Sequence, residues 1–247
     1  PVPSSAASDV YKRQVSILLD RTDKEDPGSN EEAMASLRVS VKSKNADLVG
    51  KIFSAKMIEL ALANYPGFFI GGAVRSGGPV LVYWPALIDS KHISETVHFD
   101  GKETTILPTN QLGLEETYYQ KQPIDIQPAP SDPSIKMPVG ELFGARSGDK
   151  GGCANIGVWA KTENAYSFLN ECLTVKKIKE LMPDLAEFQI DRYELPNILS
   201  LNFYIHGILE DGVSSNTRKD GQAKSLGEYL RAKYIEIPKS LIKEKEA

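Results

Sequence analysis

The residues that could bind a ligand or take part in a reaction are most concentrated in one glycine-rich stretch of this 247-residue chain. It reads GARSGDKGGCANIGVWAK, residues 144–161, and combines cations, a hydroxyl and a carboxylate with closely spaced glycines. Glycines allow backbone N–H groups to converge on an anion without interference from Cβ atoms, and Arg146 and Lys150 could add positive charge. The stretch is therefore a candidate site for a carboxylate, a phosphate or an acyl thioester.

Polar residues elsewhere in the second half extend this candidate site. Asn155 and Asn202 stand in otherwise apolar strand-like segments, where buried amides need hydrogen-bond partners. Arg218 precedes Asp220, a predicted N-cap of the last helix, and a helix N-terminus favours anions. The candidate substrate- or anion-binding residues are Arg146, Ser147, Gly148, Asp149, Lys150, Gly151, Gly152, Asn155, Asn202 and Arg218.

The glycine-rich stretch does not match the common nucleotide-binding motifs. The spacing of a P-loop is missing, no Ser or Thr follows Lys150 to hold magnesium, and the glycines do not follow the dinucleotide-binding spacing. A structural alternative is a hairpin loop in which Asp149 accepts backbone hydrogen bonds and the glycines adopt positive φ. The sequence leaves the ligand site and the structural turn open.

No catalytic residue can be assigned from the sequence, and whether the protein is an enzyme stays open. His206 shares a strand face with Asn202 and Tyr204, but no carboxylate partner is identifiable from the sequence. A structural histidine whose hydrogen bonds are satisfied is therefore favoured over a general base. Cys153 has no histidine near it in the sequence, so we do not expect a nucleophile there. The three histidines and two cysteines show no metal-ligand spacing. No metal is expected, and no cofactor is indicated.

Composition narrows the classes of partner. A net charge of −4 provides no basic field for nucleic acid, and no apolar run approaches the roughly 18 residues needed to cross a bilayer. We therefore expect neither nucleic acid nor a membrane as a partner. Two cysteines fit a reduced, cytoplasmic compartment.

The first half indicates part of an α/β domain. Residues 1–14 lack an initiator Met, an apolar signal region and any period, which predicts a non-native or disordered segment. Residues 15–108 are interpreted as the remnant of a larger amino-terminal α/β domain, because strand and helix signals occur without a repeating βα unit. The expected elements are strands near 15–19, 37–41 and 80–84, a helix from Asn45 to about Pro66, and a hairpin turning at Asp100-Gly101.

The second half has a more complete pattern. Residues 109–135 are rich in proline and polar residues, which predicts a linker, and residues 241–247 predict a charged, solvated tail. Between them, residues 136–240 predict strands at 139–145, 156–161, 188–195, 199–209 and 233–238, and helices at 163–173, 174–182 and 221–232. Without its first strand, this order is βαββαβ, the ferredoxin-like split motif. The expected fold class is α+β, a ferredoxin-like domain with an extra strand, preceded by the truncated α/β remnant.

Chain direction in this motif brings two distant loops to the same end of neighbouring strands. These are the loop 146–155 and the loop 210–220, which should meet although about sixty residues separate them. Lys150 and Arg218 are then expected to flank a shared concavity. The edge at which the extra strand pairs cannot be assigned from the sequence.

Three blocks of the second half resemble the carboxy-terminal domain of the acyclic terpene utilisation family, long described only as a domain of unknown function. They are ARSGDKGGCANIGVWA, RYELPNILSLNFYIHGIL and GQAKSLGEYLRAKYIEIP, and the resemblance covers residues from about 136 to 240. The first half resembles the end of the family's large amino-terminal domain, including ALIDSKHI after Tyr83-Trp84-Pro85, so the chain is expected to be a fragment. Cys153 stands where many relatives carry a polar residue.

The resemblance implies a role in the breakdown of methyl-branched isoprenoid acids, such as those from citronellol, as thioester-linked intermediates. It supplies neither a reaction nor catalytic residues. A small carboxylate or acyl thioester is the expected ligand, and a homo-oligomer is expected for the intact protein. The alternative is a non-catalytic ferredoxin-like module for assembly, because such sheets pair edge to edge or face to face. An apolar exposed sheet surface would favour assembly, and convergence of Lys150 and Arg218 would favour ligand binding.

Overall fold

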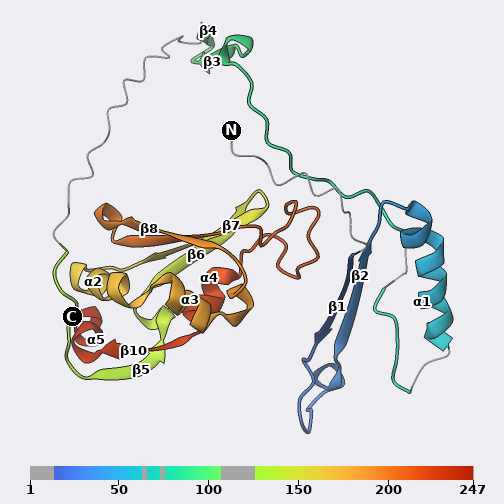
Figure 1. Cartoon of the computed structure of the whole chain (residues 1–247), viewed down its shortest axis with the longest axis horizontal. Helices are drawn as coiled ribbons and strands as arrows, with labels where there is room; N and C mark the ends of the chain where they lie inside the picture. Colours follow the sequence, from blue (N-terminus) through green and yellow to red (C-terminus); the bar gives the residue numbers. More distant parts are fainter. Residues whose placement is uncertain (1–13, 63–65, 73–75, 107–125, 247) are drawn as a thin grey trace. The chain divides into compact units, whose positions relative to one another are not determined.

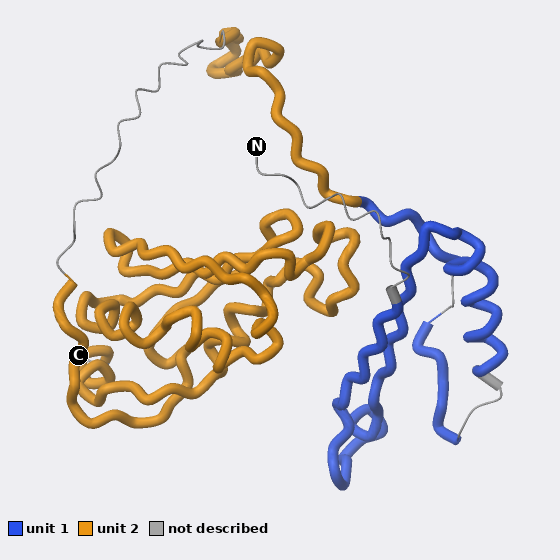
Figure 2. Tube along the Cα trace, viewed as in Figure 1, with its two compact units in different colours: residues 1–81 blue, residues 82–247 orange. Residues whose placement is uncertain are grey.

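The structure is a computed structural model that describes residues 14–62, 66–72, 76–106 and 126–246. The chain divides into two compact units, residues 1–81 and residues 82–247, and each is described by itself (Figure 2). The predicted non-native segment 1–14 lies outside the described residues except for Gln14. Residues 109–125 of the predicted linker also lie outside them.

The first unit contains an antiparallel hairpin and a helix. Strands β1 (Gln14–Asp20) and β2 (Ser36–Lys42) pair along their whole length, with Val15 opposite Val41, which confirms both predicted strands. A short 3-10 helix, η2 (Glu31–Ala33), lies in the connection. The predicted helix is also confirmed, although it starts as a π-helical turn, η3 (Leu48–Ile52), before α1 (Phe53–Leu62).

The segment between the first unit and the ferredoxin-like domain contains a second hairpin. A 3-10 helix, η4 (Ser90–His92), precedes β3 (Glu95–Phe99) and β4 (Lys102–Ile106). The turn residues Asp100 and Gly101 have φ of 49° and 72°, as a two-residue turn between twisted strands requires. This hairpin was predicted correctly. The strand predicted at 80–84 is wrong: these residues form no strand, because apolar alternation needs a partner strand to pair with.

The carboxy-terminal domain is built on a four-stranded antiparallel sheet in the order β6-β7-β9-β8. Its strands are β6 (Gly144–Lys150), β7 (Cys153–Trp159), β8 (Ile190–Leu195) and β9 (Ser200–Ile205). A separate two-stranded ribbon pairs β5 (Ser134–Pro138) with β10 (Tyr234–Pro238). The α+β, ferredoxin-like fold is confirmed. The extra strand, β6, occupies the edge that the last strand of the split motif usually takes.

The extra strand starts later than predicted. Residues 139–145 were expected to be extended, but Val139–Glu141 form a 3-10 helix, η5, and β6 starts at Gly144. The N–H groups of Leu142 and Phe143 donate to the carbonyl of Val139, so the chain completes one helical turn there. This turn buries Val139 and Phe143 in the core. The glycine-rich motif, which was expected to be a loop, therefore forms the strand.

The helices of this domain mostly follow the sequence signals. They are α2 (Glu163–Cys172), α3 (Val175–Leu181), α4 (Leu226–Arg231) and α5 (Lys239–Glu246), with short 3-10 helices η6 (Pro183–Leu185) and η7 (Pro196–Ile198). Thr162 and Thr174 cap α2 and α3 by accepting backbone hydrogen bonds from Ala165 and Lys177. Two predictions were wrong. The helix expected at 221–232 starts only at Leu226, and the expected solvated tail contains α5, which buries Leu241.

The core lies on one face of the four-stranded sheet. Alternate residues of β7 and β9 are fully buried, and α2, α3 and α4 lie on this side of the sheet (Figure 1). The intervening residues stay half-buried or exposed on the opposite face. We call this opposite face the open face; it carries Arg146, Lys150, Cys153, Asn155, Trp159, Asp191, Tyr193, Leu195, Ser200, Asn202, Tyr204 and His206.

Candidate functional site

The glycine-rich motif is a tight β-hairpin. Lys150 and Cys153 are the last paired residues of β6 and β7, so Gly151 and Gly152 alone form the turn. Gly151 has a φ of 65°, which confirms that a glycine of this motif adopts the left-handed region. A Cβ atom on Gly152 would collide with the carbonyl oxygen of Glu210. Both glycines are thus explained by the turn and by the close approach of another segment.

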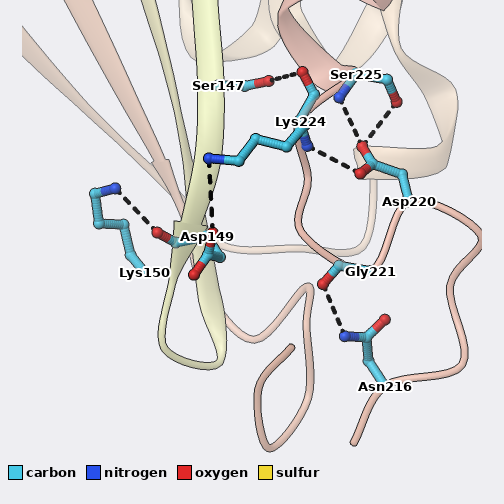
Figure 3. A network of polar contacts seen from close by, with 8 residues as sticks. All are labelled: Ser147, Asp149, Lys150, Asn216, Asp220, Gly221, Lys224 and Ser225. Atoms are coloured by element: carbon cyan, nitrogen blue, oxygen red, sulfur yellow. Dashed lines mark hydrogen bonds and ion pairs between the residues drawn. The ribbon is translucent and has the colours of Figure 1, made fainter. Parts of the chain in front are cut away.

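The two distant loops meet, as chain direction predicted. The N–H of Leu209 donates to the carbonyl of Gly152 at 2.9 Å. Farther along the hairpin, the hydroxyl of Ser147 donates to the carbonyl of Lys224 at 3.1 Å (Figure 3). The same hydroxyl accepts from the N–H of Gly227 at 2.8 Å. The hairpin is therefore fixed to the start of α4 by a side chain that was predicted to bind a ligand.

The charged residues of the two loops do not share one partner. The Nζ atom of Lys150 donates to its neighbouring backbone carbonyl, that of Asp149, at 2.9 Å. The Asp149 carboxylate lies 3.9 Å from Nζ of Lys224, and Arg218 lies 3.6 Å from the carboxylate of Asp184 in η6. Figure 3 shows Lys150 on the side of the hairpin away from Asn216 and Asp220, in the loop that precedes α4. The contacts thus do not bring Lys150 and Arg218 together.

Asp220 organises the loop before α4 rather than capping the helix directly. Its two carboxylate oxygens accept hydrogen bonds from the N–H groups of Lys224 and Ser225 and from the Ser225 hydroxyl. Ser225 is the N-cap residue of α4, so the predicted N-cap was placed too early. Burial by itself raises the pKa of Asp220, but these hydrogen bonds outweigh burial and hold the pKa below its ordinary value. Because α4 has only six residues, its N-terminus is a weak source of positive potential.

Four of the residues with predicted side-chain roles lie on the open face: Arg146, Lys150, Asn155 and Asn202. The register places Arg146 opposite Gly157 and Lys150 opposite Cys153. The side-chain amide of Asn155 donates to the amide oxygen of Asn202 at 2.8 Å, so the two amides satisfy each other across β7 and β9. Arg146 is exposed and has no ion-pair partner among the described residues. Ser147 and Asp149 belong to the opposite, helix-facing side of β6.

Sequence reasoning missed a cluster of titratable residues at the hairpin end of the open face. The Nε2 atom of His206 lies 2.7 Å from Oδ2 of Asp191, and the ring of Tyr204 contacts His206 edge-on at 4.9 Å between centroids. The N–H of Gly207 donates to Sγ of Cys153 at 3.4 Å. A hydrogen bond between Tyr204 and Cys153, reinforced by burial, raises the pKa of Tyr204 to about 12.

One expectation about this cluster was therefore wrong. His206 does have a carboxylate partner, Asp191, which comes from the neighbouring strand β8. The hydrogen bonds from His206 and from Gln189 lower the pKa of Asp191, so the carboxylate stays ionised next to the imidazole. The signal that could have revealed the pair is the register of β8 and β9, which places Asp191 opposite Tyr204.

The other end of the open face is apolar. The ring of Trp159 lies over Gly144, where a Cβ atom would overlap it, and 38% of Trp159 remains exposed. Leu195 is 42% exposed and faces Ser200, which lies between Leu195 and Trp159 in the register. The open face is thus polar at the hairpin end, where Lys150 lies, and apolar around Trp159 and Leu195 at the opposite end, near Arg146.

The described residues give no sign of a metal site or a membrane span. Among them, no three His, Cys, Asp or Glu side chains are grouped so that they could hold an ion. None of the described helices is long and apolar enough to cross a bilayer.

Comparisons with known proteins agree with this fold. A model of the AtuA ferredoxin-like domain matches residues 137–236, which include the sheet, the hairpin and the polar cluster. A second model, of the acyclic terpene utilisation family protein AtuA, matches residues 5–99. The chain is a ferredoxin-like α+β protein that belongs to the acyclic terpene utilisation family. Searches of curated proteins and of solved structures gave no match.

Proposed function

We propose that the protein acts in the breakdown of isoprenoid or methyl-branched acyl compounds, and that the open face binds their coenzyme A thioesters. The observation that carries this proposal is the polarity of the open face along its strands. Lys150 and hydrogen-bonding groups lie at the hairpin end, and apolar side chains lie at the end with Trp159 and Leu195, near Arg146. A ligand with a charged head and a branched hydrocarbon tail matches both ends.

The spacing of the two cations favours a long ligand over a short one. Arg146 and Lys150 are four residues apart on β6, which corresponds to roughly 13 Å along a strand. A coenzyme A thioester carries phosphates at a distance from its acyl group, so it can contact one cation with each part.

Titration calorimetry tests this proposal with citronellate and with its coenzyme A thioester as probes. We expect the thioester to bind more tightly than the free acid. Arg146→Glu and Lys150→Glu should each weaken thioester binding by about tenfold, because each removes one charge-assisted contact and introduces repulsion. Lys243→Glu, on the exposed side of α5, is the matched control and should leave binding unchanged. Equal affinities of all four proteins, or no binding to the wild type, would contradict the proposal.

The second candidate is a module for assembly, favoured by the exposed Trp159 and Leu195. These side chains could pack against a second copy of the sheet, as ferredoxin-like sheets do. Yet the remainder of the open face is polar, and its Asn155–Asn202 and His206–Asp191 pairs are already satisfied. Sedimentation of the wild type and of Trp159→Ser decides between the two. A dimer that dissociates in the variant while thioester binding is unchanged would support assembly.

A further inference from the structure

The side chain of Tyr83 lies against the turn of the glycine-rich hairpin. A Cβ atom added to Gly151 would lie 3.0 Å from Cε1 of the Tyr83 ring, and one added to Gly212 would lie 3.1 Å from Cβ of Tyr83. The N–H of Tyr83 donates to the carbonyl of Asp211 at 3.0 Å. Tyr83 belongs to the same compact unit as the ferredoxin-like domain, so all these contacts lie within one unit. We call Gly151 and Gly212 the glycine seat.

The absence of side chains at the seat is what allows Tyr83 to approach. Gly151 has a φ of 65° and Gly212 a φ of 115°, and the second value lies outside the left-handed region that asparagine tolerates. The neighbouring Gly152 faces the carbonyl oxygen of Glu210, where a Cβ atom would collide. The two turn glycines predicted to bind an anion therefore face an aromatic ring and a carbonyl oxygen.

The loop that carries Gly212 is held by its own hydrogen bonds. The N–H of Gly212 donates to the carbonyl of Leu209 at 2.8 Å. The carbonyl of Gly212 accepts from the N–H groups of Ser215 and Asn216, each at 3.1 Å, and from the side-chain amide of Asn216 at 2.9 Å. None of these bonds involves Tyr83, so the seat keeps its shape when the ring leaves. A binding surface formed in advance costs little ordering free energy.

The segment that meets the seat is irregular and exposed. Residues 82–84, which we call the latch, form neither a strand nor a helix. Tyr83 stays 61% exposed and Trp84 73% exposed. Because the contact consists of one backbone hydrogen bond and part of one ring, the latch can open without unfolding the sheet.

We propose that the glycine seat is a docking site for Tyr83, and that residues 82–84 form a reversible latch on the glycine-rich hairpin. The occupant is this chain's own segment, because covalent attachment raises its concentration at the seat above that of a separate molecule. The glycine-rich turn then serves recognition within the chain. The proposal does not rest on thioester binding, since neither cation of the open face forms part of the seat.

Hydrogen exchange of the Tyr83 amide in the full chain tests the docking. Gly151→Val places a side chain in the seat, so we expect this amide to exchange about tenfold faster than in the wild type. The matched control is Gly207→Val. Gly207 has a φ of 68°, close to that of Gly151, but a Cβ atom there meets nothing within 4 Å. The two variants therefore introduce similar backbone strain, and only Gly151→Val displaces Tyr83.

The two variants separate docking from general destabilisation. Faster exchange of the Tyr83 amide in Gly151→Val, with wild-type exchange in Gly207→Val, is the expected result. Equal exchange in all three proteins, or equal acceleration in both variants, would overturn the proposal.

Photo-crosslinking keeps the proposal testable where a glycine variant fails to fold. Tyr83 is replaced by p-benzoylphenylalanine in the otherwise unchanged full chain, and mass spectrometry identifies the linked peptides. We expect links to peptides that contain Gly151 or Gly212, and no such links from the same reagent at Leu87, whose side chain is fully exposed. A mixture of isotope-labelled and unlabelled chains separates links within one chain from links between copies. Links only between copies, or links from position 83 that avoid both glycine peptides, would refute the latch.

Discussion

The hydroxyl of Ser147 accepts a hydrogen bond from the N–H of Gly227 at 2.8 Å, across 80 residues of sequence. The same hydroxyl donates to the carbonyl of Lys224, so one side chain satisfies both a donor and an acceptor at the start of α4. Gly227 has little room for a side chain there, because a Cβ atom would come within 3.3 Å of the backbone of Arg146. This bond and this close approach join β6 to α4.

Replacing Ser147 by Ala should therefore destabilise the domain. The N–H of Gly227 would lose its partner in a partly buried position, which costs about 1–2 kcal/mol. Chemical denaturation measures the change, and Ser200→Ala, which removes only a local bond to Ile198 at the other end of the sheet, is the control. A Ser147→Ala protein as stable as the wild type would show that the bond is dispensable.

Substitutions of Gly151, in the turn of the glycine-rich hairpin, should change the melting temperature by amounts that depend on the new side chain. Valine there should lower the melting temperature, since a β-branched residue at a φ of 65° is strained by about 1–2 kcal/mol. Asparagine tolerates this region of backbone conformation, so Gly151→Asn should melt closer to the wild type than Gly151→Val, although a Cβ atom in either variant would lie 3.0 Å from the ring of Tyr83. Identical melting of the Val and Asn variants would mean that the turn relaxes freely.

Acid should weaken the loop held by Asp220. The pKa of this carboxyl is lower in the folded protein than its ordinary value of 3.8, so the ionised form stabilises the fold above that pH. This contribution is lost as the pH falls through the folded-state pKa. We expect Asp220→Asn to destabilise the protein at pH 7 and to have progressively less effect below about pH 4. Denaturation curves across this range provide the test, and a pH-independent difference would contradict it.

The carboxy-terminal domain should fold without the first half, but with wider limits than residues 136–240. Asp132 accepts hydrogen bonds from the N–H and hydroxyl of Ser240, and Leu241 is buried. We expect residues 126–247 to unfold cooperatively and residues 136–240 to be less stable, because the shorter piece lacks both contacts. Calorimetric melting of the two pieces is the measurement. A non-cooperative trace for the longer piece would show that the domain depends on the first half.

Local signals explain what the sequence could predict of this fold. The Asp100-Gly101 turn and the threonine caps of α2 and α3 are encoded within a few residues, so these elements were found near their true positions. The place of β6 was not predictable, because either edge of the sheet could have accepted it. The burial of α5 likewise depends on the core that it meets and not on its charged composition.

The candidate site shows the same division. A positive φ in the glycine motif and the meeting of the two loops follow from turn chemistry and chain direction. The different partners of Lys150 and Arg218 do not follow from these signals, because Arg218 pairs with Asp184, which lies in another element. Asp191 lies in β8, His206 follows the last residue of β9, and the two strands are joined through Leu199, which has a φ of 50°. The alternation of residues along a strand predicts which face of the sheet a side chain occupies. It does not predict which residue of the neighbouring strand lies opposite.

The pairing of β5 with β10 also makes the domain suitable for circular permutation and for insertion into another protein. Ser134, at the start of the domain, is paired with Pro238, near its end, so entry and exit lie at adjacent backbone positions. A short peptide could join the two, and new termini could be opened in the β8–β9 connection, to give a circular permutant with the same sheet. The same adjacency would let the whole domain be inserted into a surface loop of a host protein through one attachment point.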